Sequence, residues 1–181
     1  MKKILLGITG ASGQIYASKM MEVVNGIGGG QKIKLDLVFT DTAKVVWEDE
    51  LGVPVPANAL DNNSYYHPYA SGSNAADVMI IMPCTMGTIG RIASGATSDL
   101  LTRAADVMLK ERRPLIIVPR ETPFNLIHLR NLTTLAEAGA IIAPASPSFY
   151  THPQDMKELI NTFVRRILNI AGIEVKFKRF E

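Results

Sequence analysis

The sequence predicts an α/β protein, a three-layer sandwich in which helices cover both faces of a doubly wound parallel sheet. Three short segments, 4–8, 78–82 and 115–118, are continuously apolar, which is the pattern of strands buried on both faces. Segments with helical spacing of apolar residues alternate with them along the chain, as in βαβ units. In such sheets the ligand binds beyond the carboxyl ends of the strands, so the loops after the strands should carry the chemistry.

The remaining strands and helices have their own sequence signals. Apolar residues alternate with Lys34 and Asp36 over 33–39, the period of a half-covered strand. Ser98 or Asp99 is the expected N-cap of a helix over 100–111. The other expected elements are a short strand at 141–142 and helices over 14–24, 41–51, 86–94, 126–138 and 156–168.

The length of 181 residues fits a single domain spanning 1–181. Segment 52–74 is rich in Pro, Asn and Ser, and we expect it to be an irregular excursion, a kind of loop that is usually functional or mobile. The glycines of 26–30 predict a flexible loop, and 172–181 should form a basic C-terminal tail.

The composition excludes several classes of protein. With 19 basic and 17 acidic residues the net charge is only +2, which excludes a nucleic-acid-binding protein that works through the field of its whole surface. A single cysteine excludes an intrachain disulfide and fits a reducing compartment. No stretch approaches the roughly 20 apolar residues of a membrane span, and the apolar start of the chain is too short for a secretion signal. We therefore expect a cytoplasmic protein, and its low charged fraction of 20% suggests self-association.

The first loop, 9–13, joins a strand to a helix through small residues that let backbone N–H groups approach an anion. A dinucleotide-binding dehydrogenase is one interpretation, with Asp41 placed to serve a ribose. Tyr16 stands where the last glycine of that fingerprint belongs, which weakens this interpretation. A tight turn without a ligand is the other alternative.

The loops at 83–88 and 119–124 follow two of the apolar strands. The first has threonines and a glycine at a helix start, a cradle for an anion, while Cys84 reads as a buried structural thiol. In the second, Arg120 and Glu121 stand side by side, suited to phosphate binding and proton transfer, unless they form only a solvated ion pair. The three histidines lack metal-ligand spacing, so no metal is expected: His67, His128 and His152.

Six blocks of sequence occur together over almost the whole chain: 9–13, 83–88, 103–115, 118–124, 127–129 and 147–150. Together they resemble the flavin prenyltransferase family, the UbiX/Pad1-type flavoproteins. The resemblance implies a flavodoxin-like, Rossmann-like fold and a metal-independent enzyme. This enzyme would join a dimethylallyl group from dimethylallyl phosphate to N5 and C6 of reduced FMN and release phosphate. It further implies a homo-dodecamer with sites at subunit contacts, and a UbiD-type decarboxylase that receives the prenylated FMN.

The resemblance also implies roles for individual residues. Glu121 would donate a proton to the leaving phosphate, with Arg120 beside it, while Ser12 and Glu50 would move protons around the flavin. The acidic role is ambiguous by a residue or two within 48–50. FMN would be bound by Gly10, Ala11, Ser12, Thr40, Thr85, Met86, Gly87, Thr88, Arg103 and Arg120. Dimethylallyl phosphate would be held by Lys110, Arg120, Tyr150 and Arg166.

Two expectations concern how these groups come together. Lys110, Arg120 and Arg166 are far apart in the sequence and should converge on one phosphate. An aromatic wall for the allylic cation could come from Trp47 and the segment 65–69. The donor, monophosphate or pyrophosphate, stays open at this point.

Two rival functions use a similar fold. An FMN-dependent cysteine decarboxylase needs a histidine after the second strand and a Pro-Ala-Met-Asn segment. This chain has Thr-Asp-Thr at 40–42 and Pro-Ala-Ser-Pro at 144–147, which argues against that enzyme. A non-catalytic FMN-carrying decarboxylase subunit would leave Lys110, Arg120 and Glu121 without a purpose.

Overall fold

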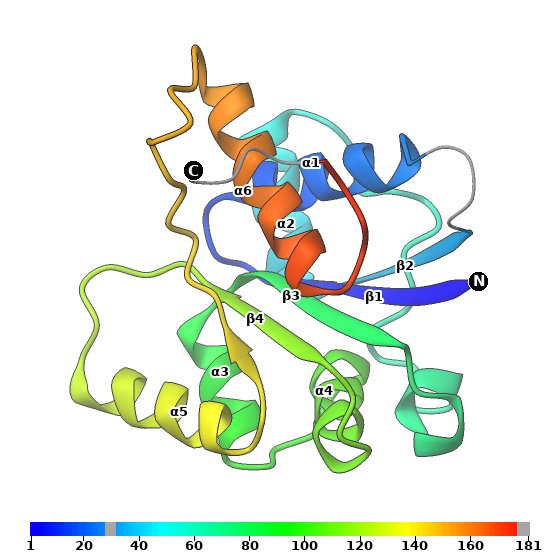
Figure 1. The fold of residues 1–181 in the computed structure, drawn as a ribbon. Helices are drawn as coiled ribbons and strands as arrows, with labels where there is room; N and C mark the ends of the chain where they lie inside the picture. The colour runs from blue at the N-terminus through cyan, green and yellow to red at the C-terminus, as the bar shows by residue number, and fades with distance from the viewer. Residues whose placement is uncertain (28–31, 177–181) are drawn as a thin grey trace.

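Five parallel strands form one sheet in the order β2-β1-β3-β4-β5 (Figure 1). The computed structural model describes residues 1–27 and 32–176, so the loop expected at 26–30 and the tail expected at 172–181 lie partly outside the described residues. The strands are β1 (Lys2–Ile8), β2 (Ile33–Phe39), β3 (Val78–Cys84), β4 (Leu115–Pro119) and β5 (Ile141–Ile142). This confirms the parallel sheet that the apolar segments predict.

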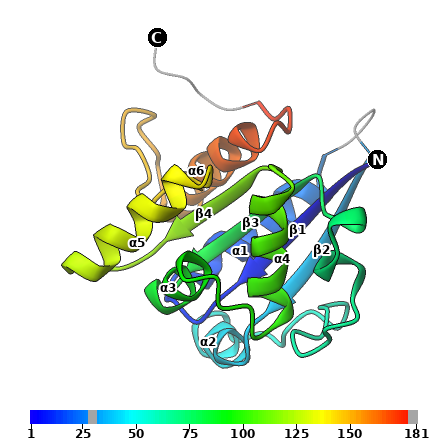
Figure 2. The same ribbon diagram turned by 90° about the horizontal axis from the view of Figure 1, so that it is seen from below.

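Helices cover both faces of the sheet (Figures 1 and 2). One face carries α1 (Gln14–Asn25), α2 (Asp41–Leu51) and α6 (Met156–Ile170). The other face carries α3 (Met86–Ala93), α4 (Leu100–Lys110) and α5 (Leu126–Glu137). These bounds agree with the expected ones to within two residues. Across the described ranges, no helix has the length and apolar character needed to cross a bilayer.

The core consists of two layers because successive side chains of a strand point to opposite faces. Ile4, Leu6 and Ile8 of β1 pack against α1 and α6, whereas Leu5 packs with α3 and α4. Every residue of β3 is buried, as expected for a central strand with helices on both sides. This double burial explains why the central strands are continuously apolar.

The segment 52–74 is irregular, as expected, apart from two short 3₁₀ turns at its end. It is nevertheless attached to the fold at defined points. The Leu60 N–H donates to the Leu37 carbonyl on β2 at 2.7 Å. Asn62 is buried and caps the start of α4, since its side-chain oxygen accepts from the Leu101 N–H at 2.9 Å. The segment therefore lies along the β2 edge and reaches the amino end of α4.

Candidate functional site

The strand order reverses between β1 and β3, and the loops that follow these two strands leave the sheet in opposite directions. Ligands of doubly wound folds bind in the crevice outside the carboxyl ends of the strands at such a point. The amino ends of α1, α2 and α3 all lie at this edge, where unpaired N–H groups and the helix dipoles favour an anion. We call this region the carboxyl edge.

The loop 9–13 after β1 is held in shape from within. The buried Gln14 side chain donates to the Thr9 and Ala11 carbonyls at 2.9 and 2.7 Å. Gly13 has a φ of 101°, a left-handed conformation that favours glycine. The Thr9 hydroxyl donates to the Pro83 carbonyl at 2.9 Å and accepts from the Thr85 N–H at 2.8 Å. The two loops at the reversal point are thus joined to each other.

Gly10 leaves no room for a side chain, because a Cβ atom there would lie 2.5 Å from Thr42 Cγ2. We expect Gly10→Ala to lower the free energy of unfolding by about 1–3 kcal/mol, since the loop or α2 must move. Urea unfolding measures the change. Gly26→Ala is the control, because the new Cβ would meet the Glu22 and Val23 carbonyl oxygens at 3.4 and 3.6 Å, which is ordinary van der Waals contact. Equal stability of the two variants would contradict a tight contact at Gly10.

Glu50 reaches from the last turn of α2 to the amino end of α1. Its carboxylate accepts from the Gly13 and Gln14 N–H groups at 2.9 and 2.8 Å, and from the Ser12 hydroxyl. Burial raises the pKa of Glu50, but these hydrogen bonds and the nearby Arg120 together outweigh it and hold the pKa below its usual value. Among the three acidic residues at 48–50, the geometry selects Glu50 as the one in contact with the loop 9–13.

The lowered pKa of Glu50 makes part of the stability dependent on pH. The contribution is present above the ordinary glutamate pKa of about 4.3 and is lost as pH falls through the lower value of the folded protein. We therefore expect the stability gap between wild type and Glu50→Gln to be largest near pH 7 and to close below about pH 4. Urea unfolding across this range measures it, and a gap independent of pH would contradict the contact.

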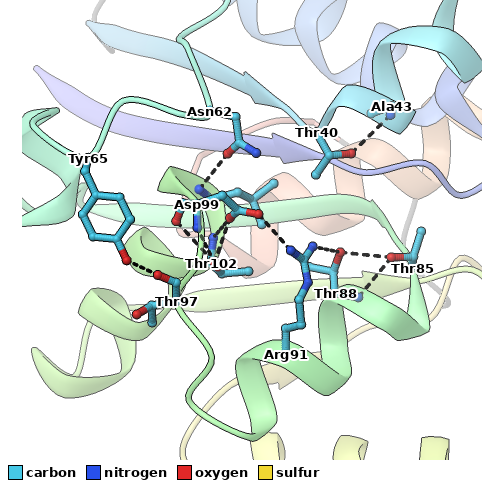
Figure 3. A network of polar contacts seen from close by, with 11 residues as sticks. Thr40, Ala43, Asn62, Tyr65, Thr85, Thr88, Arg91, Thr97, Asp99 and Thr102 are labelled. Atoms are coloured by element: carbon cyan, nitrogen blue, oxygen red, sulfur yellow. Dashed lines mark hydrogen bonds and ion pairs between the residues drawn. The ribbon is translucent and has the colours of Figure 1, made fainter.

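Threonine hydroxyls line the next two helix starts at this edge (Figure 3). Thr40 is the N-cap of α2 and accepts from the Ala43 N–H at 3.2 Å. Thr85 is the N-cap of α3, accepts from the Thr88 N–H at 3.1 Å and donates to the Thr88 hydroxyl at 3.0 Å. Met86 and Gly87 form the first turn between them. Hydroxyls and N–H groups therefore surround the reversal point, as an anion or a polar ring edge requires.

Arg120 and Glu121 follow β4 at the same edge. The Arg120 N–H donates to the Cys84 carbonyl at 3.2 Å, and the Glu121 carboxylate accepts from the Thr122 N–H at 2.9 Å. Both side chains are exposed. Burial raises the pKa of Tyr16, and the charge of Arg120 partly offsets the shift. The charge of Arg120 also lowers the pKa of Glu50, so it acts on two side chains next to the loop 9–13.

Lys110, another expected site residue, does not lie at the carboxyl edge of this chain. Lys110 ends α4 at the opposite edge and pairs with Glu111 at 2.8 Å. The five residues of β4 separate it from Arg120 by about 16 Å along the strand direction. Lys110 and Arg120 therefore do not meet within a single chain, and their expected convergence with Arg166 on one phosphate would need a site shared between subunits. Helix direction is the physical reason, because α4 runs antiparallel to the strands and carries Lys110 away.

Arg166, Tyr150 and Arg103 occupy three further places. Arg166 lies in the later part of α6, whose end receives Lys2 from the start of β1, so it is displaced toward the opposite edge. Tyr150 belongs to the segment between β5 and α6 and is partly exposed. The Arg103 guanidinium donates to the Ala70 carbonyl at 3.2 Å and to Asp106 at 3.0 Å, so it faces the end of segment 52–74.

The expected aromatic wall is wrong for Trp47. Its ring is 2% exposed and packs edge to face against Phe39 at 5.3 Å in the core beneath α2. Tyr69 is also buried, and its hydroxyl donates to Asp36 on β2. Tyr65 donates to the Thr97 carbonyl. These rings are used for packing and for anchoring segment 52–74.

Cys84 is fully buried, and burial raises the pKa of its thiol. This agrees with the interpretation of a structural thiol and not a nucleophile. Among the residues with a described position, no group of His, Cys, Asp and Glu side chains is arranged to hold a metal ion.

Arg91 and Asp99 belong to this region but were not expected from the sequence. Their side chains form an ion pair at 2.9 Å, and Arg91 also donates to the Thr88 hydroxyl at 3.3 Å (Figure 3). The only available signal was the spacing of three between Thr88 and Arg91, which places both on one face of α3.

A protein-family model described as Flavoprotein matches residues 1–168. Flavin prenyltransferase UbiX from Methanocaldococcus jannaschii is 40% identical over 185 residues, covering 98% of each chain. The chain belongs to the flavin prenyltransferase family. This confirms the resemblance that the six sequence blocks indicate.

Solved structures of UbiX-type proteins share this fold. The structure of AnUbiX in complex with FMN and dimethylallyl pyrophosphate has a TM-score of 0.90 at 35% identity and covers 99% of this chain and 97% of its own. A dodecameric FMN-dependent UbiX-like decarboxylase from Escherichia coli O157:H7 has a TM-score of 0.92 at 31% identity, with 99% of both chains covered. The FMN-dependent cysteine decarboxylase TvaF shares the fold alone, with a TM-score of 0.63 at 18% identity over 79% of this chain and 90% of its own.

Proposed function

We propose that this chain is a flavin prenyltransferase that joins the dimethylallyl group of dimethylallyl phosphate to N5 and C6 of reduced FMN and releases phosphate. The observation that carries the proposal is the combination found at the carboxyl edge in a member of this family. Helix starts and hydroxyls gather where the strand order reverses between β1 and β3, and Arg120 and Glu121 follow β4 at the same edge. The cysteine decarboxylase TvaF shares the fold at only 18% sequence identity, whereas a flavin prenyltransferase is 40% identical, which favours the transferase.

The residues at the carboxyl edge fit FMN. Gly10 packs closely on Thr42, Ser12 is exposed at the tip of the loop 9–13, and hydroxyls and N–H groups flank this loop. When bound, reduced FMN supplies the nucleophile, so no cysteine or serine nucleophile is needed. The residues that would hold it at this edge are Gly10, Ala11, Ser12, Thr40, Thr85, Met86, Gly87, Thr88 and Arg120.

Arg120 and Glu121 would act on the leaving group. When the bond between the allylic carbon and the bridging oxygen breaks, that oxygen takes the electron pair and becomes negative. The Arg120 guanidinium stabilises the charge, and Glu121 transfers its proton to the departing phosphate. Both side chains are exposed at the carboxyl edge and adjacent in sequence, so a single phosphate can contact both.

Ser12 and Glu50 would move a proton near the flavin. The Ser12 hydroxyl contacts the Glu50 carboxylate, so a proton could pass between the flavin and Glu50 through this hydroxyl. The same carboxylate is fixed by two backbone N–H groups of α1, which sets its position relative to the loop.

A second copy of the chain would complete the site. Lys110 lies at the opposite edge of its own subunit, so it would bind phosphate across a subunit contact. Arg166 and Tyr150 would bind the same phosphate, and Arg103 would organise the site. Apolar side chains that such a contact would cover are exposed on α5, in the segment between β5 and α6, and at the start of α6: Leu126, Ile127, Leu129, Phe149 and Met156. The E. coli neighbour is dodecameric, which supports a homo-dodecamer.

The product would pass to a UbiD-type decarboxylase that uses prenylated FMN. The AnUbiX complex contains dimethylallyl pyrophosphate, so both the monophosphate and the pyrophosphate are donors to compare. The cytoplasmic location expected from the sequence stays a prediction.

An anaerobic phosphate-release assay tests this function. Purified protein with reduced FMN and dimethylallyl phosphate should release inorganic phosphate, and oxidised FMN should not support release. The same assay with dimethylallyl pyrophosphate ranks the two donors. Tight FMN binding without phosphate release from either donor would overturn the transferase and favour an FMN carrier.

A further inference from the structure

Arg91 lies on α3 between the Thr88 hydroxyl at the carboxyl edge and the carboxylate of Asp99, the N-cap of α4 (Figure 3). Its Nη2 donates to the Thr88 hydroxyl at 3.3 Å, and its Nη1 donates to Asp99 Oδ2 at 2.9 Å. The side chain is 39% exposed, whereas that of Asp99 is 12% exposed. Arg91 therefore links a residue of the FMN cradle to a nearly buried carboxylate.

Hydrogen-bond geometry restricts what the Thr88 hydroxyl can do. A hydroxyl has two acceptor positions and one proton to donate. Thr88 Oγ1 accepts from the Thr85 hydroxyl at 3.0 Å and from Arg91 at 3.3 Å, so both acceptor positions are filled. Thr88 is 2% exposed, and a buried hydroxyl proton needs an acceptor. The two filled acceptor positions leave the Thr88 hydroxyl its proton to donate.

Asp99 holds Arg91 in this position. Its Oδ1 accepts from the N–H and the hydroxyl of Thr102 at 2.8 and 2.7 Å, as the capping residue of α4. Its Oδ2 accepts from Arg91. Because Oδ1 is fixed by α4, the direction of Oδ2, and with it the position of the guanidinium, is also fixed. Charge-assisted hydrogen bonds of this kind are about twice as strong as neutral ones.

We propose that Arg91 is a positioning residue for FMN binding, which acts through Thr88. With Thr85 it fills the acceptor positions of the Thr88 hydroxyl, so that this hydroxyl donates its proton to an acceptor oxygen of FMN. Asp99 fixes Arg91 for that purpose. The inference rests on the proposed function only in taking FMN as the ligand of this edge.

A double-mutant cycle on FMN affinity tests the inference. Arg91→Met and the isosteric Thr88→Val should each raise the Kd for FMN roughly tenfold. Thr88→Val removes the hydroxyl that donates to FMN, and Arg91→Met removes the group that orients this hydroxyl. Because Arg91 acts through Thr88, the double variant should bind no more weakly than Thr88→Val alone. Thr88→Ser, which restores the hydroxyl, should recover most of the affinity. Flavin fluorescence quenching measures Kd without any need for turnover.

Two further variants separate this role from a structural one. Arg165→Met is the matched control, since Arg165 makes two hydrogen bonds on α6, with Asn161 at 3.1 Å and the Lys176 carbonyl at 3.0 Å. It should leave the Kd unchanged. Asp99→Asn keeps the cap of α4 but removes the charge that fixes Arg91, so it should raise the Kd in the wild-type background and not in Thr88→Val.

The results that would overturn the role of Arg91 differ from those that would overturn the transferase activity. If wild type binds FMN but releases no phosphate, the transferase proposal fails, while the cycle still decides the role of Arg91. An Arg91→Met variant that binds FMN as tightly as wild type would overturn the inference. So would additive losses in the double variant, because an additive loss means that Arg91 acts independently of Thr88.

Discussion

Glu121→Gln is expected to slow phosphate release by about 10²- to 10⁴-fold, the usual contribution of a positioned general acid. Glutamine keeps the shape of the side chain and can still accept the Thr122 N–H, which glutamate does at 2.9 Å. It cannot supply an acidic proton to the leaving phosphate. The Kd for FMN should stay within about twofold of wild type, because Glu121 is not assigned to the flavin. Single-turnover phosphate release with reduced FMN measures the rate.

Glu48→Gln is the matched control for this prediction. Glu48 is an exposed carboxylate on α2, two residues before the glutamate that contacts the loop 9–13. Its substitution should leave phosphate release unchanged. If Glu121→Gln turned over at the wild-type rate, Glu121 would have no part in the mechanism.

Two inactive variants are expected to restore each other's activity when their subunits are mixed. Lys110→Met and Arg120→Met should each lack activity alone, because both cations are needed for one phosphate. Lys110 and Arg120 lie at opposite edges of the sheet in one chain, so a shared site must take them from two subunits. In a random one-to-one mixture about a quarter of the sites would hold both native residues, and activity should approach that fraction of wild type. Co-expression with two affinity tags isolates the mixed oligomers for assay.

The pair Arg120→Met and Glu121→Gln supplies the control for mixing. These residues are neighbours on one loop, so every site would carry one defect or the other, and no activity should return. Recovery in this control, or none with Lys110→Met and Arg120→Met, would contradict a site shared between subunits.

The sequence predicts the sheet and its helices because their signals are local. A continuously apolar strand such as 78–82 has apolar side chains on both faces, so both faces must be buried. Capping residues such as Asp99 mark where helices begin. The loops at the carboxyl edge follow from this order, since the ends of parallel strands meet at one edge. Gly10, Thr85 and Arg120 could therefore be assigned to a common region before the structure was known.

The errors and omissions have a common physical cause, which is the way each helix is oriented when it packs on the sheet and on its neighbours. Trp47 is an aromatic residue on a helix near the site, but its side chain points to Phe39 in the core. Lys110 was placed with Arg120 because the family resemblance implies one phosphate site for both, yet helix α4 carries Lys110 to the other edge. The ion pair between Arg91 and Asp99 could not be predicted, because it depends on how α3 packs beside α4.

The mass of the flavin after an anaerobic reaction tests the central claim most directly. Protein, reduced FMN and dimethylallyl phosphate should yield a flavin heavier than FMN by one C5 unit, bound to wild type and nearly absent after the same interval with Glu121→Gln. Recovery of unmodified FMN alone from wild type, with the dimethylallyl phosphate intact, would contradict the assignment of this chain as a flavin prenyltransferase.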